Sequence, residues 1–150
     1  MDQQRSVSLE RLAKARFRAT NPRGGTIDLG EGEDAAFTPV ELLLAAIAGC
    51  TGIDVDYITG KRAEALSMSI TVCAQKLRDE HGNHLTDIEA GFEVVFPDGR
   101  QGDAARAVLP DALAKSHDRL CTVSRTVELP TPVTMRIAQP ASPRSRSGSM

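Results

Sequence analysis

The sequence predicts an α+β fold in one domain, and three observations lead to this prediction. A long apolar stretch begins with a complete helix start signal at Thr38 and ends near Gly60. Two segments of alternating apolar and polar residues, 67–75 and 88–96, flank a polar turn and predict an antiparallel hairpin. A second stretch with helical spacing, 103–120, follows the hairpin. We therefore expect helices and antiparallel strands around a common core.

Size and composition are those of an ordinary globular chain. Its 150 residues, 41% of them apolar, suit one core that relies on aliphatic side chains, because aromatic residues make up only 3%. The net charge of -2 gives no field that would attract nucleic acid or an anionic membrane, so small molecules or proteins are the expected partners. We expect a single domain over residues 1–139 and a disordered tail over 140–150, which is rich in Ser, Pro and Arg.

The sequence does not predict export or membrane insertion. Residues 1–17 lack the apolar core of a signal peptide, so we expect a cytoplasmic protein. The apolar run 42–53 is shorter than the ~20 residues that span a bilayer and soon meets Asp54 and Asp56, which predicts a buried helix. Three cysteines, an odd number, argue against a structural disulfide framework in such a chain.

The N-terminal region is expected to contain a tight hairpin. The pattern at residues 9–20 fits both helical spacing and strand alternation, and spacing alone leaves both open. Residues 21–25 form a strong turn signal, because Pro22 fixes one backbone angle and the two following glycines permit positive ones. Residues 26–29 then predict a short strand, and a polar loop at 30–34 leads to the main helix.

The main helix has signals at both boundaries. Thr38 is the expected N-cap, Pro39 occupies the first helical position, and Glu41 stands three residues after the cap. Gly60, followed by two basic residues, marks its end. The helix is apolar almost all round through Ile53, which predicts a central position in the fold.

The second half of the chain predicts a hairpin, a helix and a last strand. The turn at 79–84 joins the two alternating strands. The helix over 103–120 contains Pro110, which we expect to break or bend it. Cys121 opens a short segment, 122–129, that is compatible with a helix, and residues 133–137 predict the last strand.

Two cysteines far apart in the sequence are the leading functional signal. Cys50 lies in the apolar helix, where burial raises the pKa of a thiol from about 8.5, and alone it is most simply a core residue. Cys121 precedes a short segment whose free N–H groups would stabilise a thiolate. If the fold brings the two together, a peroxide can oxidise one thiol to sulfenic acid, and the other can condense with it to a disulfide. This is the cycle of a two-cysteine peroxidase.

The segments around both cysteines resemble the signatures of the osmotically induced and organic hydroperoxide resistance proteins, the OsmC/Ohr superfamily. Pro39, Glu41 and the small-residue helix up to Gly49 and Cys50 resemble the first signature. Residues 121–124, Cys-Thr-Val-Ser, resemble the second. The resemblance covers residues 12–138.

This resemblance implies two curved antiparallel sheets wrapped around long central helices, in an intertwined homodimer with active sites at the interface. It implies a thiol-dependent peroxidase that reduces organic hydroperoxides, in which Cys50 attacks the peroxide and Cys121 resolves the sulfenic acid. An external dithiol or a lipoylated protein is the implied reductant, with no bound cofactor or metal. The many aliphatic residues predict an apolar cavity for alkyl or fatty-acid hydroperoxides.

The catalytic arginine of the family comes from the first hairpin turn, where Arg23 is the best match and Arg18 and Arg16 are alternatives. Such an arginine would stabilise the thiolate and orient the peroxide. Glu41 stands one position later than the family's glutamate, and a shift of one residue turns a helical side chain by about 100°. Glu41 is therefore interpreted first as a capping-box residue and second as a partner of the catalytic arginine.

Further departures favour a less characterised OsmC-like branch, whose pattern matches residues 49–55. Val40 occupies the place of the family's glutamate, and Thr122 replaces the proline that usually follows the second cysteine. The charge of Asp54 would oppose a thiolate at Cys50 if the two shared a pocket. The alternative function is therefore a non-catalytic protein of the same fold that senses redox state or binds a small ligand.

Four other residues carry weaker signals. Cys73 falls on the polar face of a predicted strand, with no motif around it. His81 and His84 are explained by a hairpin turn centred on residues 82–83, without metal binding. His117 is interpreted first as a solvated helix residue and second as a proton donor to the nearby cysteine.

Overall fold

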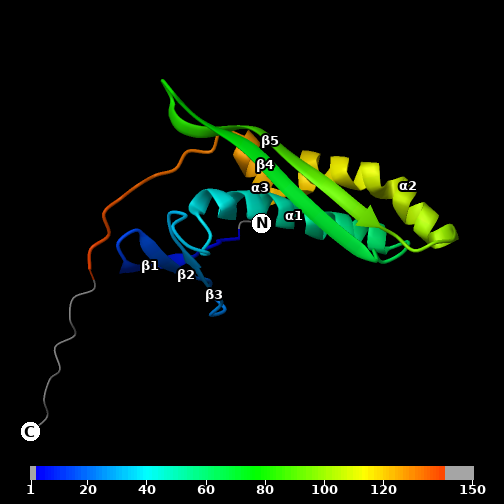
Figure 1. Ribbon diagram of the computed structural model, residues 1–150, viewed down its shortest axis with the longest axis horizontal. Helices are drawn as coiled ribbons and strands as arrows, with labels where there is room; N and C mark the ends of the chain where they lie inside the picture. The colour runs from blue at the N-terminus through cyan, green and yellow to red at the C-terminus, as the bar shows by residue number, and fades with distance from the viewer. Residues whose placement is uncertain (1–2, 141–150) are drawn as a thin grey trace, which may run out of the picture.

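The chain has an α+β architecture with two antiparallel sheets, as a computed structural model that describes residues 3–140 shows (Figure 1). The first sheet has the strand order β1-β2-β3, and the second pairs β4 with β5. In chain order the elements are β1 (Ser8–Ala13), β2 (Arg16–Thr20), β3 (Thr26–Leu29), α1 (Pro39–Gly60), β4 (Ser67–Asp79), β5 (Gly82–Val95), α2 (Arg100–Lys115), the π-helical turn η1 (Ser116–Leu120) and α3 (Thr122–Glu128). The predicted α+β class is confirmed.

Strand pairing decides between the two interpretations of residues 9–20. β1 pairs antiparallel with β2, and Leu9 lies opposite Ala19. The chain reverses through Ala15, whose φ of 57° lies in the left-handed region. β2 then pairs with β3, and this second contact buries Ala19 and Leu29 on the inner face of the sheet. The segment therefore forms two strands and no helix.

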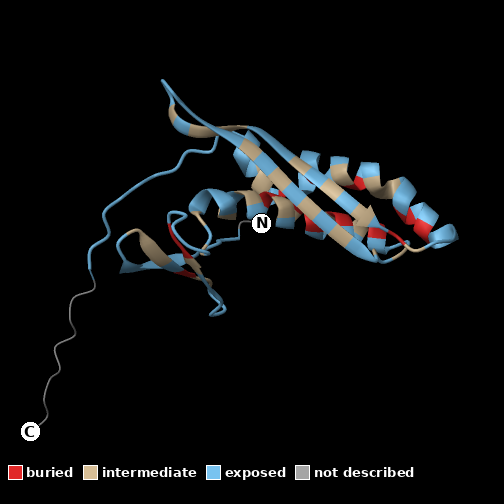
Figure 2. Cartoon of the chain, viewed as in Figure 1, coloured by how far each residue is buried: buried red, intermediate tan, exposed pale blue. Residues whose placement is uncertain are grey.

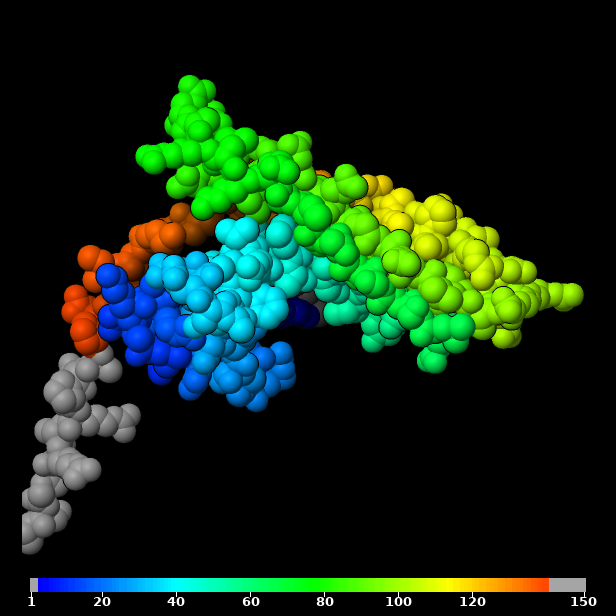
Figure 3. All heavy atoms as spheres, in the orientation of Figure 1, coloured from blue at the N-terminus to red at the C-terminus, as the bar shows by residue number. Residues whose placement is uncertain are grey.

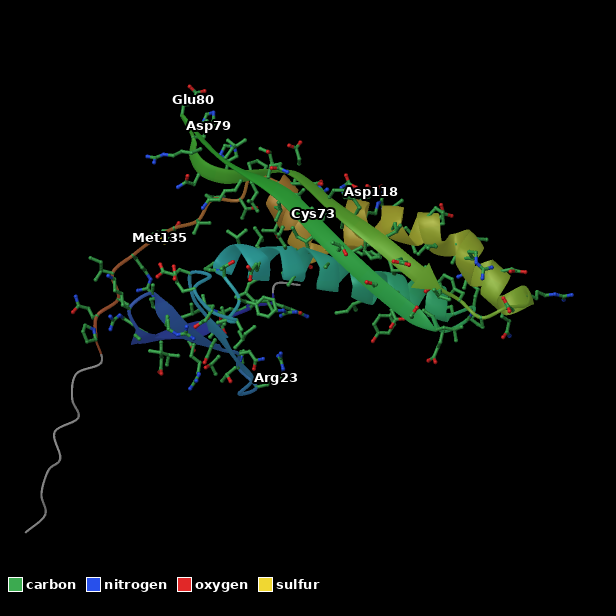
Figure 4. All side chains as sticks on the ribbon, viewed as in Figure 1. Arg23, Cys73, Asp79, Glu80, Asp118 and Met135 are labelled. Atoms are coloured by element: carbon green, nitrogen blue, oxygen red, sulfur yellow. The ribbon has the colours of Figure 1, made fainter. Side chains whose placement is uncertain are left out.

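The predicted turn between β2 and β3 is confirmed. The Asn21 side-chain oxygen accepts hydrogen bonds from the backbone N–H groups of Arg23 at 3.0 Å and Gly25 at 2.9 Å. Gly24 adopts a φ of 89°, a conformation that glycine takes without steric strain. The turn therefore fixes the backbone of Arg23 at one tip of the first sheet, where Figure 4 shows its side chain.

Helix α1 begins and ends where the sequence predicts. The Thr38 hydroxyl accepts the backbone N–H of Glu41 at 3.2 Å, and the Glu41 carboxylate accepts the backbone N–H of Thr38 at 3.1 Å. This reciprocal pair is a capping box, and Pro39 stands in the first turn beside it. The helix runs to Gly60.

Helix α1 is longer than the apolar run 42–53, whose length argued against a membrane span. With 22 residues, α1 is long and apolar enough to cross a membrane. The core helix of a soluble protein meets the same two criteria, so length and composition do not by themselves make α1 a membrane span. Only 28% of its apolar window is buried within the chain, which leaves much of the helix surface without a packing partner.

β4 and β5 form the predicted hairpin, and one face of it packs on α1. Residues 67–75 alternate strictly between exposed and part-buried positions. Ile70 on the inner face comes so close to α1 that a Cβ added at Gly52 would lie 2.7 Å from the Ile70 Cδ1 atom. Gly52 therefore lets the second sheet approach α1 two residues after Cys50.

Pro110 was predicted to break or bend the second helix, and it does not break it. α2 starts at Arg100, three residues earlier than expected, and continues through Pro110 to Lys115. A proline removes the hydrogen bond to the carbonyl four residues back, which here belongs to Arg106. Both Arg106 and Pro110 are exposed, so water can satisfy the carbonyl that the proline leaves free.

The last strand predicted at residues 133–137 is absent from the chain, which has no regular structure there. The sequence alternates apolar and polar residues there, but the apolar Val133, Met135 and Ile137 are 79%, 86% and 97% exposed. A strand forms only where a neighbouring strand pairs with its backbone groups, and no strand of the described chain pairs with this segment. The tail expected at 140–150 lies almost entirely outside the described residues.

The core lies between the second half of α1 and the segment formed by α2 and η1, where the buried residues gather in Figure 2. Val55 and Thr59 of α1 and Ala105 and Ala112 of α2 are fully buried. Phe96, which follows β5, closes this core at 4% exposure. The candidate site lies on the same stretch of α1.

The first sheet lies apart from this core. It is joined to the rest of the chain by the loop before α1. Leu29, at the end of β3, forms a bridge with Phe37 of that loop. Figure 3 shows the sheet, in blue, beside the start of α1, in cyan, and the tip of the β4–β5 hairpin projecting from the body. Large apolar side chains of this sheet are exposed, with Leu9 at 50% and Ile27 at 40%. A single copy therefore leaves apolar surface uncovered.

Candidate dithiol site

Two thiols that are far apart in the sequence meet where α1 packs against α3. Cys50 lies near the middle of α1, and Cys121 is the N-cap residue of α3. The two side chains are hydrogen-bonded, and the Cys50 thiol is the donor to the Cys121 sulfur. Both are free thiols; Cys121 is fully buried and Cys50 is part-buried. The fold thus brings together the two cysteines that the sequence analysis selected.

The π-helical turn η1 carries Cys121 to this place. The Cys121 N–H donates to the Ser116 carbonyl at 2.8 Å, and this wider turn ends α2 at the site. Ser116 is fully buried, and its hydroxyl donates to the Asp54 carboxylate of α1 at 2.8 Å. Asp54 lies about one helical turn after Cys50. Adjacent turns of α1 therefore hold Cys50 and the anchor of the segment that positions Cys121.

Cys121 has surroundings that stabilise its thiolate. Its sulfur accepts the Ser124 backbone N–H at 3.3 Å, and its thiol donates to the Ser124 hydroxyl oxygen, also at 3.3 Å. Thr51 and Cys50 add side-chain hydrogen bonds to the same sulfur. Burial alone would raise the pKa of Cys121, but these hydrogen bonds outweigh burial and lower the pKa below the ordinary thiol value.

Cys50 has the opposite surroundings, although it touches the same helix end. Burial raises the pKa of Cys50 most, and the neighbouring Cys121 and the charge of Asp54 raise it further. The Val123 backbone N–H donates to the Cys50 sulfur and partly offsets this rise. The net result is a pKa above the ordinary thiol value, so Cys121 is the thiol of the pair that loses its proton more readily.

The arginines predicted for the site lie elsewhere in the same chain. Arg23 stands at the tip of the β2–β3 turn, away from the contact between α1 and α3 (Figure 4). Arg18 and Arg16 form ion pairs with carboxylates of the first sheet and of the loop that follows it. The single chain therefore does not place any of the three beside its Cys50.

Glu41 has the first of the two roles considered for it. Its carboxylate completes the capping box with Thr38, more than two helical turns before Cys50. Its second role, as the partner of a catalytic arginine, stays a prediction because it depends on where Arg23 lies in an assembly.

A cavity of about 420 Å³ opens beside the dithiol, between α1, β5 and α3. Thr51 and Ser124, which both bond to Cys121, line it. Its wall combines aliphatic residues, among them Ile47, Ile88 and Val127, with the ionisable residues Asp87, His117 and Glu128. The cavity is therefore of mixed character, less apolar than the composition predicts.

His117 is committed to carboxylates and does not bond to a cysteine. Its ring nitrogens lie 2.9 Å from the Asp118 carboxylate and 2.7 Å from the Glu128 carboxylate. These two hydrogen bonds, the one to Asp118 first, raise the pKa of His117. The contact with Glu128 ties η1 to the end of α3, so His117 supports the segment on either side of Cys121.

The other sequence signals lie outside the dithiol site. Cys73 is exposed on β4, and His81 and His84 stand at the tip of the β4–β5 hairpin beside the acidic residues labelled there in Figure 4. Across residues 3–140, no group of three or more His, Cys, Asp or Glu side chains is arranged to hold a metal ion.

Sequence reasoning missed two contacts of the site, the hydrogen bonds of Ser124 to Cys121 and of Ser116 to Asp54. Ser124 stands three residues after Cys121, which is the spacing from an N-cap to the N–H group that it accepts, so this signal was present in the sequence. The contact between Asp54 and Ser116 joins residues 62 positions apart, and local spacing carries no information about it.

The family of OsmC-like proteins matches residues 30–136, a span that contains both cysteines and every element from α1 to α3. The chain belongs to the OsmC-like family. No curated protein matches this OsmC-like chain in sequence.

Solved structures share the fold of this OsmC-like chain. A hypothetical protein from Aquifex aeolicus is 26% identical, with a TM-score of 0.68 over 84% of this chain and 88% of that one. An OsmC-like protein of unknown function from Vibrio cholerae is 15% identical, with a TM-score of 0.72 over 85% and 95%. An organic hydroperoxide resistance protein from Legionella pneumophila is 17% identical, with a TM-score of 0.57 over 85% and 92%. The OsmC/Ohr fold expected from the resemblance is confirmed.

Proposed function

We propose that this OsmC-like protein is a thiol-dependent peroxidase that reduces organic hydroperoxides in the response to oxidative stress. The observation that supports this best is the contact between Cys50 and Cys121 at the start of α3. Thiols that already touch can close a disulfide with little rearrangement of the helices that carry them. The Legionella protein named for hydroperoxide resistance shares the fold, and it lends support at that level.

In the proposed cycle, the Cys50 thiolate attacks the terminal peroxide oxygen and the O–O bond breaks. The alkoxide leaves, takes up a proton and becomes an alcohol, and Cys50 becomes a sulfenic acid. The Cys121 sulfur then attacks the Cys50 sulfur, and water leaves as the disulfide forms. The lowered pKa of Cys121 suits this resolving step, because the attacking thiol must be a thiolate. A dithiol, such as a lipoylated protein, restores both thiols.

The first step requires a cation that a single protomer does not place at Cys50. The raised pKa of Cys50 must fall before its thiolate forms at neutral pH, and a nearby guanidinium would lower it. We propose that an intertwined homodimer supplies this group, with Arg23 of one copy reaching the dithiol of the other. The uncovered surface of the single chain and the unpaired segment 133–137 support such an assembly.

One observation favours a second candidate function, a redox sensor or small-ligand binder of the same fold. Asp54 holds a carboxylate near Cys50 and raises its pKa, which slows attack on a peroxide. A sensor needs to be oxidised only once per signal, so slow attack is compatible with that role. The cavity beside the dithiol, with both aliphatic and ionisable lining residues, is equally compatible with a bound ligand.

Peroxide turnover separates the two functions. Cumene hydroperoxide and hydrogen peroxide are offered in parallel to wild type, Cys50→Ser and Cys121→Ser, with dihydrolipoamide as reductant. A peroxidase consumes many equivalents of the organic peroxide, loses turnover in Cys50→Ser, and accumulates sulfenic acid at Cys50 in Cys121→Ser. If wild type forms one disulfide and then stops, the sensor is correct and the peroxidase is not.

A further inference from the structure

We propose that reduction of the Cys50–Cys121 disulfide begins with attack on the Cys50 sulfur, and that Cys121 is the leaving thiolate, held by Ser124 and Thr51. This inference rests on the disulfide of the proposed function and adds which sulfur meets the reductant. Three features of the site support it: access, the surroundings of the leaving sulfur, and the charge beside the other one.

Access favours the Cys50 sulfur. Cys50 is part-exposed, whereas Cys121 is fully buried beneath the start of α3. The helix surface next to Cys50 is open, because a Cβ added at Gly49 would meet no atom within 4 Å. An incoming thiolate therefore reaches Cys50 without displacing a helix.

The surroundings of Cys121 favour it as the leaving group. In thiol–disulfide exchange, the sulfur with the lower thiol pKa leaves faster. The Ser124 N–H already points at the Cys121 sulfur at 3.3 Å, and the Ser124 hydroxyl, at the same distance, can rotate to donate once that thiol has lost its proton. The Thr51 hydroxyl adds a further hydrogen bond. These groups replace water around the leaving thiolate in a position that water does not reach.

The opposite direction of cleavage is disfavoured. It would release a thiolate at Cys50, where the charge of Asp54 raises the energy of the anion. Asp54 is fixed there because its carboxylate accepts the buried Ser116 hydroxyl. The same anchor that positions Cys121 thus also biases which sulfur leaves.

The exchange balances with a dithiol as the reductant. Its first thiolate forms a bond to the Cys50 sulfur, the bond between Cys50 and Cys121 breaks, and the electron pair goes to Cys121. The second thiol of the reductant then loses its proton, and the resulting thiolate attacks the reductant's first sulfur, which is bonded to Cys50 in the mixed disulfide. This step closes the reductant into a cyclic disulfide. Cys50 leaves as a thiolate and takes the proton that the reductant's second thiol lost. Two electrons have passed from the dithiol to the pair of cysteines.

A monothiol probe can stop the exchange at its first step. The wild-type chain is oxidised with diamide, exposed briefly to glutathione, quenched in acid and blocked with N-ethylmaleimide. Trypsin places the three cysteines in separate peptides, residues 24–61, 63–76 and 120–125, so mass spectrometry assigns each modification. We expect glutathione on Cys50 and maleimide on Cys121, in roughly tenfold or greater excess over the reverse pattern.

The outcomes are distinct from those of the peroxidase test, because diamide and not a peroxide makes the disulfide. Glutathione found mainly on Cys121 overturns the inference and leaves the peroxidase proposal standing. A failure of diamide to link Cys50 to Cys121 overturns both. Glutathione on Cys50 in a protein without peroxide turnover supports the inference and rejects the peroxidase.

A matched pair of serine variants tests the role of Ser124. Ser124→Ala removes the hydroxyl beside the leaving sulfur and keeps the backbone N–H, so we expect opening of the disulfide by glutathione to slow by about threefold or more. Ser69→Ala, at an exposed position of β4, is the control and keeps the wild-type rate. Equal rates in the two variants would remove Ser124 from the proposal, and circular dichroism verifies that both remain folded.

Discussion

Asp54 has two effects on the dithiol, and they oppose each other. As a hydrogen-bond acceptor it holds the Ser116 hydroxyl at 2.8 Å and fixes the turn before Cys121. As a negative charge it raises the pKa of Cys50 and disfavours the thiolate that the first chemical step needs. A substitution that removes the charge and keeps an acceptor oxygen separates the two.

Asp54→Asn is expected to make Cys50 more reactive. The asparagine oxygen can still accept the Ser116 hydroxyl, so the dithiol should stay in place while the pKa of Cys50 falls. We expect alkylation of Cys50 by iodoacetamide at neutral pH to accelerate by roughly two- to fivefold. The measurement is the rate of modification of the peptide that contains Cys50, taken across pH.

Asp56→Asn is the matched control for that experiment. Asp56 is exposed on the same helix and does not act on Cys50. Its replacement by asparagine changes the net charge by the same amount as Asp54→Asn, without changing the charge beside the thiol. An alkylation profile of Asp54→Asn identical to that of Asp56→Asn would show that the Asp54 charge has no effect on Cys50.

Residue chemistry was predictable from the sequence only where type and local spacing carry it. Cys50 and Cys121 stand out because few residue types do thiol chemistry, and the capping pair of Thr38 and Glu41 follows from a spacing of three. The order of the two thiol pKa values also follows from burial of Cys50 and from the helix start after Cys121, whereas the hydrogen bonds of Thr51 and Cys50 to Cys121 depend on the packing of α1 against α3.

At the scale of elements, α3 is held by contacts at both of its ends. Its first turn bonds to the dithiol through the N–H groups of Val123 and Ser124. Its last turn is tied to η1 by His117, which bonds to Glu128 at 2.7 Å, and the same carboxylate group pairs with Arg125 at 3.0 Å. A helix of 7 residues is too short to be stable by itself, so these ties keep its N-terminal N–H groups at the two sulfurs.

The tie at His117 predicts a pH-dependent contribution to stability. Hydrogen bonds to Asp118 and Glu128 raise the pKa of His117 above its unfolded value of about 6.5, so the folded state binds the proton more tightly. This contribution is complete below about pH 6.5 and is lost as the pH rises through the raised folded value. We expect the urea midpoint of wild type to lose its advantage over His117→Gln as the pH rises above about 6.5.

The comparison with His117→Gln removes the effect of other titrating groups, because both proteins share them. His117 is 57% exposed, so the difference between the two urea midpoints is expected to be small. The sign of its change with pH is the test. A difference between the two midpoints that stays constant with pH, or grows as the pH rises, would contradict the assigned ion pairs.

Elements were predicted well where the pattern is local and poorly where it depends on neighbours. The cap of α1, the β2–β3 turn and the alternation of β4 all appear as expected. Pro110 did not break α2, because the carbonyl that it leaves unpaired is on the exposed side. Residues 133–137 have the alternation of a strand, but alternation cannot supply the second strand that a ladder requires.

At the scale of the whole molecule, a single chain leaves apolar surfaces uncovered. Its first sheet stands apart from the core, and only 28% of the apolar window of α1 is buried. Large exposed apolar residues occur on α1, in the first sheet and along 133–137. These three surfaces are where an intertwined homodimer would place its interface.

Substitution in the C-terminal segment tests the dimer. We expect wild type to be a dimer by light scattering after gel filtration, and Ile137→Asp to weaken it by roughly tenfold or more, because a carboxylate would be buried in the interface. Thr134→Asp is the control, since Thr134 belongs to the opposite face of the same alternation and would point to solvent. A wild-type protein that is a folded monomer at all concentrations would exclude the dimer and with it the supply of Arg23 from a second copy.

The turn η1 has a consequence for how the sequence can evolve. A π-helical turn holds one residue more than the α-helical turn that it replaces, and here that residue brings Cys121 round to face Cys50. Loss or gain of a single residue would rotate Cys121 by about 100° and separate the sulfurs, although both cysteines would remain in the sequence. Ser116 and His117 carry the contacts of η1 with α1 and α3, whereas Arg119 and Leu120 are exposed. Selection on this segment should therefore act on its length and on these two contact residues more strongly than on the rest of its composition.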